Sequence, residues 1–257
     1  MSFPLIYFMP LDPFALSVIF IGLGLGAIVK SFAGAGLPLV AVPFMSIFLG
    51  VEHAVVVIQI PNIISNLWLI YANRSKIKET PLHLELIIPS AVAVFIGVWF
   101  LSFADRELTD VLLAGFLGIF LILIWLKPEF KLSGLTNKIV TPAVSILGGF
   151  IQGSAGASQP IYSPLLYSLR LSRESFLLYN GLLFGIFNTI QVFGMLIFGM
   201  FTLEHLRQGL LALIPLFIFQ YAGMKVSGRI SRSSSNRLVL IILIAIEMKL
   251  VWDVFTK

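Results

Sequence analysis

The sequence predicts an all-α polytopic membrane protein made of two inverted five-segment repeats, each with a broken or re-entrant first helix pair. Only 11% of the residues are charged, 58% are hydrophobic, and the mean hydropathy is +1.01, whereas soluble domains carry about 25% charged residues. A helix-breaking motif also occurs twice, as Ala-Gly-Ala-Gly-Leu-Pro at residues 33–38 and as Ala-Gly-Ala-Ser-Gln-Pro at residues 155–160.

A constant shift of 122 residues superimposes the two copies of this motif and continues well beyond them. The aligned pairs are Gly26 and Gly148, Gly34 and Gly156, Pro38 and Pro160, Glu52 and Glu174, Asn66 and Asn188, and His83 and His205. An internal repeat with a matching helix break in each copy is typical of transporter cores.

Apolar runs separated by Gly, Pro and charged residues predict five segments in each half. The first half gives residues 14–32, 37–49, 54–71, 84–101 and 108–126, and the second half gives 139–154, 160–169, 175–200, 206–226 and 238–255. We therefore divide the chain into a first membrane repeat (1–127), a cytoplasmic linker (128–137) and a second, inverted membrane repeat (138–257). Together the two repeats form one integral membrane domain.

Basic residues gather in four short clusters between the apolar segments. These are Arg74, Lys76 and Lys78; Lys127, Lys131 and Lys138; Arg170 and Arg173; and Arg229, Arg232 and Arg237. Loops rich in Lys and Arg stay on the cytoplasmic side, so the acidic or mixed loops at Glu52, at residues 105–110 and at Glu204 are expected outside. This assignment places both termini outside and gives the two repeats opposite orientations.

The second segment of each repeat is too short to cross a bilayer. Residues 37–49 rise about 20 Å as a helix and residues 160–169 about 15 Å, against a hydrocarbon core of ~30 Å. We interpret each initial pair as a helix that enters the membrane, breaks, and returns as a half-helix. Residues 14–32 are long enough to cross fully, so the first break lies beyond the midplane unless Gly22, Gly24 or Gly26 kinks the helix.

Both half-helices direct their N-termini at the breaks, because Pro38 and Pro160 stand near the first turn, where proline favours helix initiation. A helix N-terminus offers unpaired N–H donors and a partial positive charge, so two converging N-termini suit an anion. The glycines of the breaks are candidate binding positions: Gly34, Gly36, Gly153 and Gly156. The alternative is that these glycines only permit close helix packing.

Lys30, three residues before the first break, adds a candidate full positive charge. Its repeat equivalent is Gln152, so the predicted site is electrostatically asymmetric. Charged residues inside a membrane are costly and are typical of substrate pathways. In the alternative interpretation, Lys30 ends a full-length helix and extends its ammonium group to the cytoplasmic surface.

A polar stripe marks the third segment, where Gln59, Asn62 and Asn66 share one helical face. The equivalent segment of the second half carries Asn180, Asn188 and Gln191. Such amides can donate hydrogen bonds to an oxyanion, although hydrogen bonding between helices is the alternative role for any one of them. Further polar candidates on or beside the breaks are Ser31, Ser154, Ser158, Gln159 and Tyr162.

The remaining chemistry-bearing residues argue against other functional classes. The chain has no cysteine, and His53, His83 and His205 fall at segment ends without metal-ligand spacing. We find no nucleophile–base pair, so we expect neither an enzyme nor a bound metal or cofactor. The net charge of +5 comes from short clusters rather than one basic face, which argues against a nucleic-acid partner.

Residues 22–43 are followed by an amide-bearing helix and read Gly-Leu-Gly-Leu-Gly-Ala-Ile-Val-Lys-Ser-Phe-Ala-Gly-Ala-Gly-Leu-Pro-Leu-Val-Ala-Val-Pro. This segment resembles the sulfite exporter TauE/SafE family of permeases. Residues 148–164 resemble the weaker second copy of the family motif. By motif position, Gly34, Gly36, Pro38 and Pro43 match the first pattern, and Gly153, Gly156, Pro160 and Pro164 match the second. Where the family often has glycines, this chain has Ala35 in the first copy and Ala157 and Ser158 in the second, which leaves the particular anion open.

The resemblance implies a multi-pass permease of the bacterial inner (cytoplasmic) membrane for small sulfur-containing anions such as sulfite or an organosulfonate. We hypothesise export by alternating access, with the anion and the lipid bilayer as partners. The alternative is an anion channel or an uptake permease on the same scaffold. Coupling to a proton or another ion and assembly as a homodimer are left open by the sequence.

Overall fold

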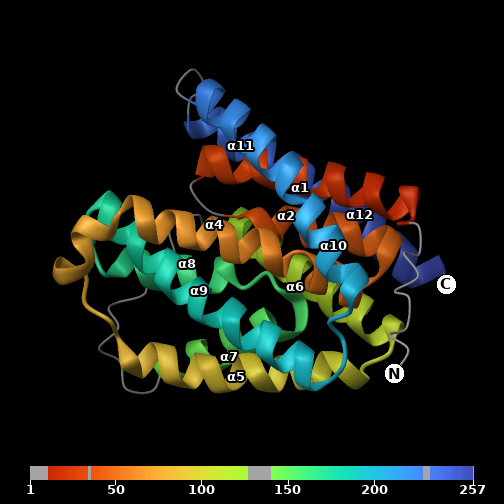
Figure 1. Ribbon diagram of the computed structural model, residues 1–257, viewed down its shortest axis with the longest axis horizontal. Helices are drawn as coiled ribbons and strands as arrows, with labels where there is room; N and C mark the ends of the chain where they lie inside the picture. Colours follow the sequence, from red (N-terminus) through yellow and green to blue (C-terminus); the bar gives the residue numbers. More distant parts are fainter. Residues whose placement is uncertain (1–10, 34–35, 127–139, 228–231, 257) are drawn as a thin grey trace, which may run out of the picture.

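The computed structural model describes residues 11–33, 36–126, 140–227 and 232–256, and the regular structure in these ranges is entirely helical (Figure 1). The first half contains α1 (Pro13–Ala33), α2 (Leu37–Leu49), α3 (Val51–Val57), α4 (Gln59–Ala72), the 3₁₀ helix η1 (Arg74–Glu79), α5 (Leu84–Phe103) and α6 (Arg106–Leu126). The second half contains α7 (Val140–Ala155), α8 (Gln159–Ser168), α9 (Arg173–Ile197), α10 (Leu203–Leu211), α11 (Leu213–Ser227) and α12 (Arg232–Thr256). The predicted linker 128–137 lies outside the described residues.

The prediction of an all-helical membrane protein is confirmed. Within the described ranges, six stretches are long and apolar enough to cross a membrane: Pro13–Ser31, Val51–Ala72, Leu84–Phe103, Arg106–Ile124, Arg173–Ile197 and Leu203–Gly223. Helix α2 is apolar but has only 13 residues, and α7 and α8 have 16 and 10. Helix α12 is long, but Glu247, Lys249 and Asp253 interrupt its apolar run.

Two segments that we predicted as single helices, 54–71 and 206–226, are each divided in two. The first is divided at Ile58, between α3 and α4, and the second at Ala212, between α10 and α11. Proline explains both divisions, because it cannot donate a hydrogen bond to the carbonyl four residues earlier. Pro61 lies four residues after Val57, where α3 ends, and Pro215 lies four residues after Leu211, where α10 ends.

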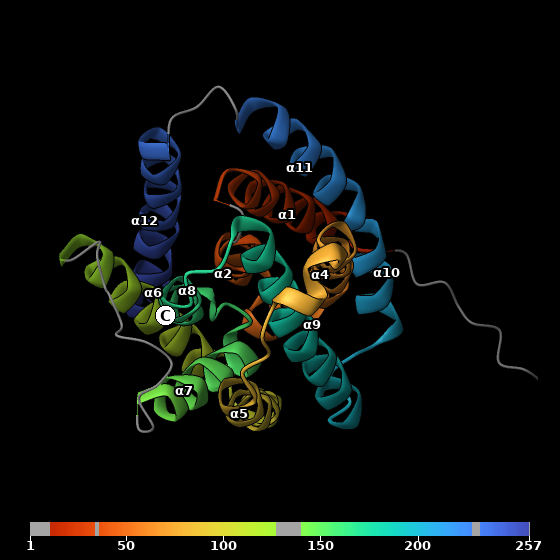
Figure 2. The ribbon, with the colours of Figure 1, turned by 90° about the vertical axis from the view of Figure 1, so that its left-hand side faces the viewer.

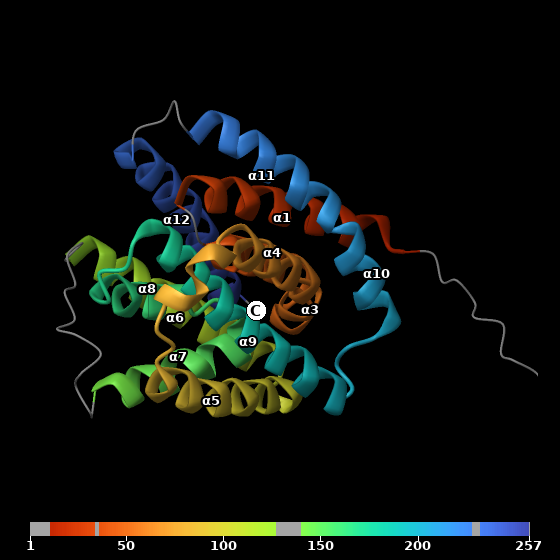
Figure 3. The same cartoon turned by 60° about the vertical axis from the view of Figure 1, so that its left-hand side comes forward.

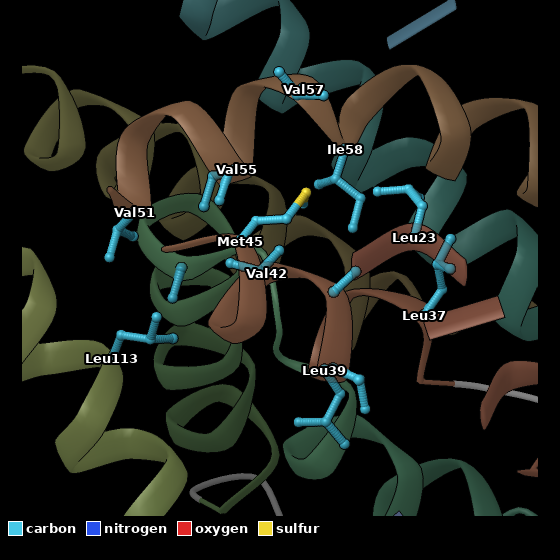
Figure 4. Close-up of a cluster of buried hydrophobic side chains, with 14 of the residues drawn as sticks. Leu23, Leu37, Leu39, Val42, Met45, Val51, Val55, Val57, Ile58 and Leu113 are labelled. Atoms are coloured by element: carbon cyan, nitrogen blue, oxygen red, sulfur yellow. The ribbon is translucent and has the colours of Figure 1, made fainter. Parts of the chain in front are cut away.

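The short helix α2 lies in the middle of the molecule, surrounded by longer helices (Figure 2). Its buried residues, Leu37, Leu39, Val40, Ala41, Val42, Pro43, Met45 and Ser46, cover most of its circumference. They pack in one core cluster with residues of α1, α3 and α6, including Leu23, Val55 and Leu113 (Figure 4). Because α2 is apolar on every side, it is stable only when enclosed by other helices.

The most extensive contacts between helices join the two halves of the chain. Helix α5 of the first half packs along α7 of the second, and α1 packs along α11 (Figure 3). Helix α4 packs against α9, and α6 packs against α12. The two halves are therefore interlocked and do not form separate bodies.

The α5–α7 contact depends on glycines that let the two backbones touch. A Cβ atom added at Gly97 would lie 2.4 Å from the carbonyl oxygen of Phe150, and one at Gly149 would lie 2.4 Å from that of Ser90. At Gly153 the corresponding distance to the carbonyl oxygen of Val94 is 2.1 Å. Real Cβ atoms do not approach backbone oxygen so closely, so even alanine would force the helices apart.

Gly149→Ala should therefore lower the thermal unfolding temperature of the protein in detergent, because overpacking costs about 1–3 kcal/mol. Gly115→Ala on α6 is the matched control, since an added Cβ there meets no atom within 4 Å. The control should leave the unfolding temperature unchanged or raise it, because alanine is favoured over glycine in a helix by about 0.5–1 kcal/mol. Equal unfolding temperatures for both variants would contradict the close α5–α7 approach.

Candidate functional site

A small cavity lined by polar and apolar side chains lies where the two chain breaks meet. It is lined by Lys30, Leu37, Pro38, Leu39, Asn62, Asn66, Gln152, Gly156, Ala157, Gln159, Phe184 and Asn188. Eight of these residues were predicted as binding residues from the sequence. The cavity thus joins residues from the two halves, such as Lys30 and Gln152, that lie far apart in the sequence.

The two breaks face each other across this cavity. Gly36, the N-cap of α2, has the left-handed φ of 104°, and Gly156, just before α8, has φ of 68°. Glycine adopts this backbone conformation without the clash that a side chain would cause. A Cβ atom at Gly36 would lie 3.8 Å from Oε1 of Gln159, which connects the first break to the start of α8. The first turns of both half-helices therefore border the cavity.

Lys30 lies in the cavity wall and is only 8% exposed. Its Nζ donates a hydrogen bond to Oγ of Ser65 on α4, so the side chain points into the protein and does not extend to its surface. Among the described residues, no carboxylate oxygen lies within 4 Å of this ammonium group. Burying a charge without an opposite charge is expensive, and the cavity is where a counter-ion can reach it.

Asn62 and Asn66 flank Ser65 on the same face of α4 and also line the cavity. Both side chains are buried, with 4% and 6% exposure. Within the described part of the chain, neither side-chain amide forms a hydrogen bond. Gln159 is similar, since its buried Oε1 has no hydrogen-bond partner there. These three amides are therefore available to a ligand.

The second-half side of the cavity is different, because its amides bind one another. Nε2 of Gln152 donates to Oε1 of Gln191 at 2.8 Å and to Oδ1 of Asn188 at 3.3 Å, and its Oε1 accepts from Oγ of Ser158 at 2.6 Å. Nε2 of Gln191 donates back to the carbonyl oxygen of Gln152 at 2.7 Å. This amide network (Gln152, Ser158, Asn188 and Gln191) ties the second break to α9 and fixes the shape of that wall.

Several other predicted residues that the structure describes are not among those lining the cavity. Oγ of Ser31 donates to the carbonyl oxygen of Ile28 at 2.6 Å, Oγ of Ser154 to that of Phe150 at 2.8 Å, and Nε2 of Gln59 to that of Val55 at 2.7 Å. Gly153 lies in the α5–α7 contact, and Gly34 lies outside the described residues.

Tyr162 was also predicted, and its ring is fully buried among α5, α7 and α9. Its hydroxyl donates to Oγ of Ser90 at 2.7 Å and approaches the carbonyl oxygen of Ser145 at 3.1 Å. The hydroxyl therefore joins α8 to α5 and α7, away from the cavity lining.

Ser65 is the functional side chain that the sequence analysis missed. It stands three residues after Asn62 and one before Asn66, so it belongs to the polar stripe on α4 by helical spacing. Only the structure shows that its hydroxyl accepts the Lys30 hydrogen bond. Phe184 of α9 was also not predicted and supplies an aromatic face to the cavity.

An interlocked helical bundle with apolar spans, and a buried lysine in a cavity between two helix breaks, define a membrane transport protein. The chain belongs to the sulfite exporter TauE/SafE family, whose model matches residues 18–250. It is therefore a multi-pass membrane transporter of that family. The comparison with curated proteins gives no match, and neither does the comparison with solved structures.

Two glutamine variants should separate the roles of the cavity amides. Gln152→Ala should lower the thermal unfolding temperature without any ligand, because each lost hydrogen bond costs about 0.5–1.5 kcal/mol. Gln159→Ala should leave that temperature nearly unchanged, since the Gln159 carbonyl oxygen has no partner to lose. An equal fall of the unfolding temperature in both variants would contradict the difference between Gln152, whose amide is hydrogen-bonded, and Gln159, whose carbonyl oxygen is not.

Proposed function

We propose that this protein is a permease that exports a small sulfur-containing anion, such as sulfite or an organosulfonate, by alternating access. The observation that carries the proposal is the buried ammonium group of Lys30, which faces the cavity without a carboxylate among the described residues within 4 Å. An anion in the cavity would supply the missing charge. The family supplies the substrate class.

The cavity has the groups that an oxyanion requires. Lys30 would bind the charge, and the side-chain NH₂ groups of Asn62 and Asn66 would donate hydrogen bonds to its oxygens. The first turns of α2 and α8 would add the partial positive charge of helix N-termini. Leu37, Leu39 and Phe184 give the same cavity an apolar part that suits the carbon atoms of an organosulfonate.

The helix contacts support the inverted repeat on which alternating access would depend. The shift of 122 residues maps α1 onto α7 and the α10–α11 pair onto α5. The α1–α11 contact therefore corresponds to the α5–α7 contact. In the other two contacts, each helix packs against its own equivalent in the other half: α4 against α9, and α6 against α12. Such reciprocal pairing is expected for two repeats related by a pseudo-two-fold axis, with the substrate bound between them.

The distribution of basic residues supports a location in the bacterial inner membrane with both termini outside. Arg74, Lys76 and Lys78 lie on or beside η1, which would face the cytoplasm. We further propose that transport is coupled to a proton or another ion, because export of an anion needs an energy source when its gradient opposes it.

The test is flux in liposomes containing the purified protein, with sulfite, sulfoacetate, taurine, sulfate and chloride as substrates. Transport of one anion should be saturable and should respond to an opposing gradient. That anion should also raise the unfolding temperature, since a ligand that binds only the folded state stabilises it. Flux that rises linearly with concentration would favour an anion channel, and a response to no anion would overturn the substrate class.

Lys30→Met should weaken binding of the transported anion about 10- to 100-fold, because a hydrogen bond to a charged group contributes about 1.5–3 kcal/mol. Lys249→Met is the matched control, since Lys249 is half-exposed and pairs with Asp253 on α12. The control should bind and transport normally. Unchanged affinity in Lys30→Met would remove Lys30 from the site.

A further inference from the structure

A pair of histidines joins the two halves of the protein at the end predicted to lie outside. His53 belongs to α3 and His205 to α10. Their rings meet edge to face, with centroids 4.8 Å apart, and Nε2 of His205 lies 3.3 Å from Nδ1 of His53. Neither residue lines the anion cavity, so its role in transport is not to contact the substrate.

The hydrogen bonds around the pair fix which nitrogens carry protons. Nε2 of Gln208 donates to Oε1 of Glu204 at 3.1 Å, which leaves Oε1 of Gln208 to accept from Nε2 of His53 at 2.7 Å. Nδ1 of His53 is then the acceptor for Nε2–H of His205. Nδ1 of His205 accepts from the backbone N–H of Thr202 at 3.2 Å, in the capping box of α10.

This chain of hydrogen bonds is complete only when both rings are neutral. A proton on Nδ1 of His53 would place two N–H donors opposite each other at 3.3 Å, unless the proton of His205 moved to its Nδ1, where it would remove the hydrogen bond from Thr202. A proton on Nδ1 of His205 would break the capping box that starts α10. If both rings were protonated, two positive charges would also repel each other across the same contact.

The surrounding charges are few. Glu204 acts on both rings, and Glu52 acts on His53. The other charged or titratable groups on α3, α10 and the helices packed against them are Arg207 on α10, Arg106, Glu107 and Asp110 on α6, Tyr71 at the far end of α4, and Tyr221 and Lys225 at the far end of α11. Helices α2 and α7 carry no charged side chain. The two carboxylates Glu52 and Glu204 would stabilise a protonated pair once it has separated.

The histidines lie on the two short helices that precede the proline breaks. Helix α3 leads through its break into α4, which carries Asn62 and Asn66, and α10 leads into α11, which packs along α1, the helix that carries Lys30. The breaks also touch, because a Cβ atom at Gly209 would lie 3.1 Å from the carbonyl oxygen of Val57. A change in the α3–α10 contact would thus reach the helices that carry Lys30, Asn62 and Asn66, on the first-half side of the cavity.

We propose that the His53–His205 contact is a pH-sensitive latch, which holds α3 and α10 together when both rings are neutral and releases them when the outer medium becomes acidic. The latch does not depend on which anion the cavity binds. Because histidine is the side chain that ordinarily changes charge near neutral pH, acidification of the outer medium is the signal to which such a contact would respond.

The absence of cysteine from the chain allows a direct test with the full-length protein. Spin labels are attached at Phe48→Cys on α2 and Leu203→Cys on α10, two exposed positions, and their separation is measured at several pH values. In the protein with native histidines, a second, longer distance should grow in as the pH falls from 7.5 to 5. The same distance at every pH would overturn the proposal.

Two variants show whether the histidine pair itself is responsible. His53→Gln keeps a donor for Gln208 and an acceptor for His205 but cannot be protonated, so the labels should keep the short distance at every pH. His205→Gln offers either a donor or an acceptor to His53, and it should also keep the short distance at every pH. It replaces His53→Gln in the test if that variant fails to fold. His83→Gln is the control and should leave the pH response unchanged. A full pH response in His53→Gln or His205→Gln would contradict the latch.

Discussion

The cost of placing the Lys30 ammonium group inside an apolar bundle is the constraint on which the rest of the structure depends. An isolated charge loses several kcal/mol when it leaves water, and one hydroxyl group, Ser65, does not replace that hydration. The surrounding architecture does not remove the cost: two interrupted helices direct N–H groups, and so further partial positive charge, at the same space, and the α4 amides remain without internal partners. Under the proposed function, an anion in the cavity would offset this positive charge.

Much of the fold could be predicted because its signals are local. The bounds of α2 follow from Pro38 at one end and Gly50 at the other, and the long apolar spans follow from hydropathy. The division of two long segments was missed, although the proline at i+4 that divides each one is visible in the sequence. Hydropathy is the same on both sides of such a break, so an apolar run gives no sign of it.

The site was predicted less completely because a sequence gives the position of a side chain but not its direction. Lys30 has two interpretations in sequence, surface or site, and only the packing of α1 against the rest of the bundle separates them. Tyr162 and Ser154 stand beside the second break, yet their hydroxyls bind the helices around them. Gln152 and Asn62 are both amides near the breaks, but only Gln152 is hydrogen-bonded within the protein. Its partner Gln191 lies 39 residues after Gln152 in the chain, so the sequence gives no sign of this bond.

The enclosed helix α2 has a consequence for how the protein is made. A helix of about 20 Å does not by itself span the bilayer, and its neighbours include α12, which is synthesised near the end of the chain. Early spans such as α1 and α4 can enter the membrane during translation, but α2 cannot complete its packing until the C-terminal helix has arrived. Completion of the packing around α2 is therefore a late event in the synthesis of the chain.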